Sequence, residues 1–231
     1  KDALNKLIPL TEKSAIDGWL STVNEWKTKF PLSYIKEGEI IKPQYVIETI
    51  SEYTKGDAII ATEVGQHQMW TAQFYKFSKP RTWISSGGLG TMGFGFPASI
   101  GAQLGMPDKL VFNIAGDGSI QMNIQEMATI SNYDIPIKII ILNNQFLGMV
   151  RQWQELFFDK RYSSTYLAKN TVNYDKSNGK TNHEREYFPD FVKLAEAYGV
   201  KGIRVDKTSE VKKAIKEIID HKGPILADFR I

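Results

Sequence analysis

The stretch KLVFNIAGDGSIQMNIQEMATISNYDIPIKIIILNNQFLGMVRQWQ, residues 109–154, decides the fold. A short β-rich run ends at the turn GDG (116–118), and a longer apolar run over 135–142 ends at the pair NN (143–144). A nearly unbroken apolar run of this kind is typical of a central parallel strand that is covered on both faces. We therefore predict strand, turn, helix, strand and a second helix, in that order.

Asp117 and Asn144 each follow the carboxyl end of a predicted strand. Open α/β sheets bind ligands at that edge. One carboxylate and one amide oxygen suit a hard cation such as Mg²⁺, which usually shares its ligands with phosphate. Asn123, with Glu126 three residues later, is expected to cap the helix between the two strands. The free N–H groups of that helix would then face a diphosphate.

Predicted strands and helices alternate along most of the chain, which indicates an α/β fold: a doubly wound parallel sheet with helices on both faces. Because the sequence starts as though inside a helix, we expect a fragment of a longer chain. Residues 1–38 are expected to be the tail of a preceding central domain and a linker. Residues 39–231 are expected to be a C-terminal domain with a polar insertion at about 168–187.

Composition excludes several classes of protein. The 231 residues carry a net charge of +3 without a basic run, which argues against nucleic acid as a partner. The sequence has no cysteine, so disulfides and thiolate metal sites are excluded, and its three histidines lack zinc-like spacing. No apolar run approaches the length of a membrane span, so no membrane partner is expected.

Two alternative functions stay open on the residues alone. Gly88-x-Gly90-x-x-Gly93 matches the dinucleotide fingerprint, and Asp117 follows the next strand, so a nicotinamide-dependent oxidoreductase is one alternative. It leaves the pair 143–144 and the run 65–67 without roles. The other alternative is a non-catalytic binding or assembly module that has lost its cofactor; the intact candidate metal ligands argue against it.

Several motifs together resemble the catalytic subunit of acetolactate synthase (acetohydroxyacid synthase) over about residues 41–231. Asp117 and Asn144, with a glycine on each side of the acid, match the thiamine diphosphate signature of that wider class. The context GMVRQWQ is similar to the biosynthetic, FAD-containing branch of the family. The other matching motifs are KPQYVIE, EVGQHQMWTAQFY, PRTWISSGGLGTMGFGFPASIGAQ, GDGSIQMNIQEMAT, LNNQFLGMVRQWQELFF, RYS and PDFVKLAEAYG.

The resemblance implies thiamine diphosphate and Mg²⁺ as cofactors. It places the metal on the Asp117 and Asn144 side chains and the Phe146 carbonyl. The Gly90 carbonyl is expected to accept a hydrogen bond from the aminopyrimidine, and Met92 to force the cofactor into its bent conformation. Val150 and Trp153 are expected to shape the pocket of the second substrate. The full set of expected cofactor contacts is Val64, Gly65, Gln66, His67, Gly90, Met92, Gly116, Gly118, Ser119 and Met149.

The activity that the resemblance implies is decarboxylating carboligation of pyruvate with a second 2-keto acid, pyruvate or 2-ketobutyrate, in branched-chain amino-acid biosynthesis. The glutamate that activates the cofactor belongs to the family's N-terminal domain. We therefore expect no catalytic residue in this chain and no activity from the fragment alone. FAD is expected in the full-length enzyme, with its site mostly outside this chain. The expected partners are a second copy in a homodimer or tetramer and a small regulatory subunit, in a bacterial cytoplasm or a plastid.

Overall fold

The computed structural model describes residues 1–12, 14–168, 174–175, 180–181 and 188–231. It divides into two units, Lys1–Ile35 and Lys36–Ile231; the predicted boundary between residues 38 and 39 stays a prediction. The first unit holds α1 (Asp2–Leu7), a 3₁₀ turn η1 (Ile8–Leu10) and α2 (Asp17–Lys29). None of its described residues is buried.

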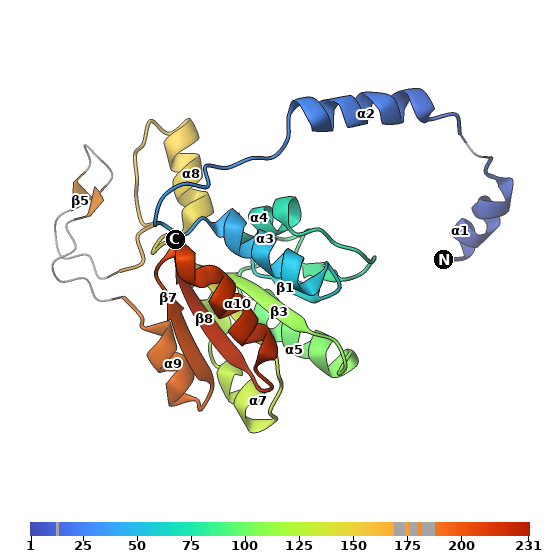
Figure 1. The fold of residues 1–231 in the computed structure, drawn as a ribbon. Coiled ribbons are helices and arrows are strands. Elements are labelled where there is room, and N and C mark those ends of the chain that lie inside the picture. Colours follow the sequence, from blue (N-terminus) through green and yellow to red (C-terminus); the bar gives the residue numbers. More distant parts are fainter. Residues whose placement is uncertain (13, 169–173, 176–179, 182–187) are drawn as a thin grey trace. The chain divides into compact units, whose positions relative to one another are not determined.

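The second unit is built on a parallel sheet (Figure 1). In the described part of the chain this sheet has six strands, in the order β2-β1-β3-β4-β8-β7, and every pairing between them is parallel. The predicted α/β fold with a parallel sheet is therefore confirmed. The strands are β1 (Ile59–Thr62), β2 (Trp83–Ser85), β3 (Val111–Gly116), β4 (Lys138–Asn143), β7 (Lys201–Val205) and β8 (Ile225–Arg230).

Helices cover both faces of the sheet, as alternating strands and helices predict. One core cluster joins buried side chains of α5 (Gly95–Gly105), α7 (Glu126–Asn132) and α9 (Phe191–Ala197) to the strand residues that point their way, among them Val111, Ile139 and Leu226. Alternate strand residues point to the opposite face, where α3 (Pro43–Thr54), α4 (Gln66–Phe74) and α10 (Val211–Asp220) lie (Figure 1). Both faces of the central strands are thus dry, which explains the apolar run in β4.

The direction in which the chain crosses the sheet changes at β1. From β1 the chain moves outward to β2, then returns to the other side of β1 to form β3 and β4. Ligands bind at such a switch point, outside the carboxyl ends of the strands. Register pairs Gly116 with Leu142, so the turn after β3 lies beside the turn after β4. A single helical turn, α6 (Asp117–Ile120), follows β3, and α8 (Gly148–Phe157) follows β4.

The predicted capping role of Asn123 is wrong. Helical structure begins at Asp117 in α6, continues as the 3₁₀ turn η2 (Gln121–Asn123), and resumes at Glu126 in α7. The Asn123 side chain instead donates a hydrogen bond from Nδ2 to the carbonyl of Gly93, at 2.6 Å. The Asn123 side chain therefore bonds to a residue that is distant in the sequence, and it does not cap the helix as the local pattern predicted.

Most of the predicted polar insertion at about 168–187 lies outside the described residues. Within it, β5 (Tyr174–Asp175) pairs antiparallel with β6 (Lys180–Thr181). A further 3₁₀ turn, η3 (Thr208–Glu210), precedes α10. Among the described helices, none combines the length and the apolar character that crossing a membrane requires.

Candidate cofactor and metal site

A pocket lies at the carboxyl ends of β1, β3 and β4 and encloses about 450 Å³ of empty volume, its open mouth included. All the predicted site residues line it except Gly90 and Trp153. The prediction missed four lining residues, of which Trp70 follows His67 by one turn of α4, a spacing that could have identified it. The pocket is lined by Val64, Gly65, Gln66, His67, Trp70, Met92, Gly116, Asp117, Gly118, Ser119, Leu142, Asn144, Phe146, Leu147, Gly148, Met149 and Val150.

Asp117 is the only carboxylate in this lining. Its Oδ1 accepts a hydrogen bond from the Gly118 N–H at 3.0 Å, whereas its buried Oδ2 has no hydrogen-bond partner among the described residues. Burial raises the pKa of Asp117 to about 7, with a small further rise from the charge of Asp228, while backbone N–H groups of Gln145 and Gly118 act to lower it. A buried carboxylate oxygen without a partner is unfavourable unless a ligand satisfies it, so this atom marks a place for a donor or a cation.

Asn144 and Phe146 lie on the turn after β4. Asn144 Oδ1 accepts the Phe146 N–H at 3.0 Å, which fixes the amide beside the backbone of the turn. Phe146 forms an antiparallel bridge with Tyr166, and the hydrogen bonds of this bridge are made by the flanking residues, from Leu147 to Thr165 and from Leu167 to Gln145. In that pattern the Phe146 carbonyl points away from residues 165–167. Asp117, Asn144 and Phe146 all line the pocket, and a carboxylate, an amide and a backbone carbonyl are ligand types that Mg²⁺ accepts.

His67 forms the wall between β1 and β3. A Cβ on Gly65 would stand 2.7 Å from its Cε1, and one on Gly116 would stand 2.9 Å from its Nδ1, so both positions need glycine. Its Nε2 is buried and has no hydrogen-bond partner in the described part of the chain. Burial lowers the pKa of His67 to about 3, against a hydrogen bond with the Glu63 backbone that raises it. The imidazole is therefore neutral at physiological pH and offers its second nitrogen to a ligand.

We expect His67 to make the protein less stable in mild acid. A base whose pKa falls from 6.5 when unfolded to about 3 when folded stabilises the fold above pH 6.5, and that contribution is lost as the pH falls. At pH 5 the loss is about 2 kcal/mol. Urea unfolding at pH 7.5 and pH 5 should show this extra loss in the wild type relative to His67→Gln. Equal losses in the two proteins would contradict the assignment.

The glycine turn that carries Met92 is held by Glu63, a residue that the sequence did not single out. Glu63 is fully buried after β1, and its carboxylate accepts the Gly93 N–H at 2.6 Å and the Phe96 N–H at 2.8 Å. The Gly93 carbonyl accepts from Asn123, as described above. The turn is thus anchored from both sides, and its Met92 lines the pocket.

Gly90 and Trp153 lie near the pocket but outside its lining. Gly90 adopts a left-handed conformation (φ 63°) that favours glycine, and a Cβ there would stand 3.8 Å from Val64. Trp153 is 58% exposed on α8, where its ring packs against Phe157, whereas Val150 is 51% exposed and lines the pocket. Their predicted roles stay predictions.

Comparison with known proteins gives the class of this site. The family described as "Thiamine pyrophosphate enzyme, C-terminal TPP binding domain" matches residues 63–229. The chain belongs to this family. Its match begins directly after β1 and runs into β8, so it includes every residue that lines the pocket. Membership confirms the predicted thiamine-diphosphate-binding domain, with thiamine diphosphate and Mg²⁺ as cofactors.

Relatives of the chain are acetolactate synthases. It is 50% identical over 210 residues to "Acetolactate synthase 3, chloroplastic" of Brassica napus, covering 91% of this chain and 30% of that protein. It is 46% identical over 228 residues to "Acetolactate synthase 1, chloroplastic" of Nicotiana tabacum (97% and 32%), and 45% identical over 217 residues to "Acetolactate synthase large subunit" of Cyanidium caldarium (94% and 34%). These similarities confirm the predicted resemblance. The chain spans about a third of the length of these relatives.

The pocket fits a diphosphate with a divalent cation. Of the residues that line it, Asp117 and His67 each have a buried side-chain atom, Oδ2 and Nε2, with no hydrogen-bond partner in the described part of the chain. Gly118 lines the pocket where a larger residue would not fit, since a Cβ there would stand 2.7 Å from Leu147 Cδ2. The nicotinamide alternative gains no support from the comparisons, which point to a thiamine enzyme.

Proposed function

We propose that this chain supplies the thiamine diphosphate and Mg²⁺ site of an acetolactate synthase, which joins pyruvate to a second 2-keto acid with loss of CO₂. The observation that carries the proposal is Asp117 Oδ2, which is buried and has no partner among the residues that the structure describes. It lies at the strand end beside the turn that contains Asn144 and Phe146. The similarity to acetolactate synthases supports the choice of reaction within the thiamine enzymes.

In this proposal Asp117, Asn144 and the Phe146 carbonyl hold the cation. With a cation held there, the buried Asp117 carboxylate would be compensated and the diphosphate charge neutralised. His67, with Val64, Gly65 and Gln66, contacts the cofactor near its diphosphate, as do Gly116, Gly118 and Ser119. The Gln66 side chain donates a hydrogen bond from its Nε2 to Gln152 Oε1 at 3.1 Å, which connects the segment 64–67 to α8.

The glycine turn and the start of α8 orient the rest of the cofactor. Met92 and Met149, which line the pocket, would contact the bound cofactor, and the Gly90 carbonyl would accept a hydrogen bond from its aminopyrimidine. Bound thiamine diphosphate supplies the nucleophilic carbon and the electron sink for decarboxylation. The chain's own residues hold it in place and exclude water, which is the protein's usual contribution in a cofactor enzyme.

The second 2-keto acid, pyruvate or 2-ketobutyrate, is proposed to bind beside Val150 and Trp153. Both side chains are more than half exposed on the same helix, one at the pocket and one a turn further along. A homodimer or tetramer, a small regulatory subunit and FAD belong to the same proposal. So does a location in a plastid or a bacterial cytoplasm; the names of the two plant relatives include the word chloroplastic.

The test is an assay of the full-length protein for acetolactate formed from pyruvate. Activity should require both thiamine diphosphate and Mg²⁺, and 2-ketobutyrate should yield the mixed product. Binding of thiamine diphosphate without any product would favour the non-catalytic module. Binding of NADH, with none of thiamine diphosphate, would overturn the proposal in favour of the nicotinamide alternative.

A further inference from the structure

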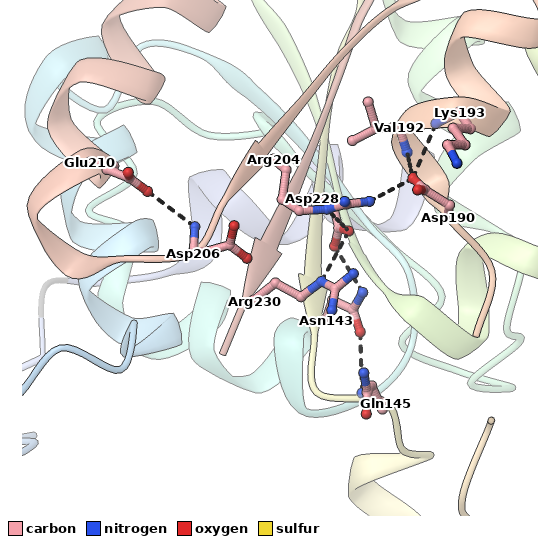
Figure 2. Close-up of polar contacts among 10 residues, drawn as sticks. All are labelled: Asn143, Gln145, Asp190, Val192, Lys193, Arg204, Asp206, Glu210, Asp228 and Arg230. Atoms are coloured by element: carbon pink, nitrogen blue, oxygen red, sulfur yellow. Dashed lines mark hydrogen bonds and ion pairs between the residues drawn. The ribbon is translucent and has the colours of Figure 1, made fainter. Parts of the chain in front are cut away.

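A buried polar network lies behind the proposed metal site and joins β8 to the turn that carries Asn144 (Figure 2). Its centre is Asp228, which is fully buried on β8. The Asn143 side chain, buried at the end of β4, donates a hydrogen bond from Nδ2 to Asp228 Oδ1 at 2.9 Å. Neither residue lines the pocket, so this pair can act on a ligand through the turn, besides the effect of the Asp228 charge on Asp117.

The other end of the Asn143 amide holds that turn. Asn143 Oδ1 accepts the Gln145 N–H at 3.2 Å, as Figure 2 shows. This N–H belongs to the peptide that joins Gln145 to Asn144. A carboxylate only accepts hydrogen bonds and an N–H only donates them, so the orientation of the amide between them is fixed by chemistry.

The turn needs such a hold because its backbone is unusual. Gln145 has φ 65°, a left-handed conformation that is unfavourable for a residue other than glycine. It stands between Asn144 and Phe146, the two cation ligands that this turn is proposed to supply. Fixing the peptide between Asn144 and Gln145 therefore fixes the distance between an amide ligand and a carbonyl ligand.

Two arginines balance the buried charge. Asp228 Oδ2 lies 3.6 Å from Arg204 Nε and 3.4 Å from Arg230 Nε, and both arginine side chains are about a third exposed. Arg204 also pairs with Asp190, which caps α9 by accepting the N–H groups of residues 192 and 193 (Figure 2). These pairs occupy Oδ2, and they leave Oδ1 as a fixed acceptor for Asn143. A buried carboxylate without such partners would be strongly unfavourable.

We propose that Asp228 and Asn143 are positioning residues for the divalent cation, acting together as a relay that holds the Asn144–Phe146 turn in its ligating conformation. The inference rests on the proposed function, since it assigns a role toward the same cation. Neither side chain touches the cation. Outer partners that orient metal ligands in this way typically change metal affinity 10- to 100-fold when they are replaced.

The test is a pair of variants that first break the relay and then rebuild it. Asn143→Asp puts two carboxylates face to face, and it should weaken cation binding by about 10- to 100-fold. Adding Asp228→Asn restores a donor at 228 facing an acceptor at 143, with the net charge of the wild type. This double variant should bind the cation within about 3-fold of the wild type. Binding is measured with Mn²⁺ in place of Mg²⁺, by electron paramagnetic resonance on the full-length protein at saturating thiamine diphosphate.

Asn132→Asp is the matched control for Asn143→Asp. It makes the same change of charge at an exposed position, the last residue of α7, and should leave Mn²⁺ affinity unchanged. Wild-type affinity in Asn143→Asp, or a folded double variant that binds Mn²⁺ more than 10-fold weaker than the wild type, would overturn the relay. Should Asn143→Asp fail to fold, the double variant decides alone.

The same titration separates this inference from the proposed function. Absence of Mn²⁺ binding in the wild type, or unchanged binding in Asp117→Ala, would refute the cation site itself. Normal wild-type binding that Asp117→Ala abolishes and the relay variants leave unchanged would refute only the relay.

Discussion

Asp117→Ala is expected to abolish Mg²⁺-dependent binding of thiamine diphosphate. Replacing an outer partner of a metal typically costs 10- to 100-fold in affinity, so the loss of a direct carboxylate ligand should exceed about 100-fold. The variant also removes the charge that offsets the cation in the pocket. Calorimetry of the full-length protein with thiamine diphosphate, with and without Mg²⁺, measures the loss.

The same variant should be no less stable than the wild type when no ligand is present. Asp117 is buried with one oxygen that has no partner among the described residues, and its alanine replacement removes that unfavourable group. The lost hydrogen bond from Gly118 has the opposite effect, by about 1 kcal/mol. We therefore expect the free energy of unfolding of the ligand-free variant to stay within about 1 kcal/mol of the wild type.

Ligand-induced stabilisation makes the contrast visible in one experiment. At 100 times the dissociation constant a ligand stabilises the wild type by about 2.7 kcal/mol, and a variant that does not bind gains nothing. Asp108→Ala, at an exposed aspartate before β3, is the control and should keep the full shift in melting temperature. A normal ligand-induced shift in Asp117→Ala would show that Asp117 is not a metal ligand.

Asp117 and Asn144 could be predicted because each follows a run of residues whose pattern is visible in the sequence. The two apolar runs form neighbouring strands, and parallel strands bring their carboxyl ends to one edge of the sheet. The predicted contacts at 64–67 follow β1 in the same way. Position in the sheet alone is enough to bring these segments to one pocket.

The partners of the buried charges on β4 and β8 could not be predicted. Lys138 interrupts an apolar run and is buried because its Nζ donates to the carbonyls of His221 and Gly223, at 2.6 and 2.9 Å. Asp228 is buried because Asn143 and two arginines surround it. Apart from Arg230, the partners of these charges are distant in the sequence, so no local pattern identifies them. Asn123 was misassigned for the same reason.

Glu63→Leu is expected to damage both the fold and the cofactor site. The Glu63 carboxylate accepts hydrogen bonds from the N–H groups of Gly93, in the turn before α5, and of Phe96, at the start of α5. Each buried N–H left without an acceptor costs about 1–3 kcal/mol. Leucine also relieves the burial of a charge, so the net loss should be about 2–4 kcal/mol in the free energy of unfolding. Because the turn carries Met92 into the pocket, affinity for thiamine diphosphate should fall with it.

Glu63→Gln tests whether hydrogen bonding to the turn is the cause. Glutamine keeps one acceptor and the shape of glutamate, so it should recover most of the cofactor affinity that leucine loses.

Burial raises the pKa of Glu63 above 4.5, so the stability that this group contributes is present at low pH and is lost as the pH rises through its folded pKa. Glutamine does not titrate, so the variant should gain stability relative to the wild type as the pH rises from 4.5 to 7.5. Urea unfolding at both pH values measures this, with Glu196→Gln, at an exposed position on α9, as the control. If Glu63→Leu binds the cofactor as tightly as Glu63→Gln does, the anchoring role of Glu63 is refuted.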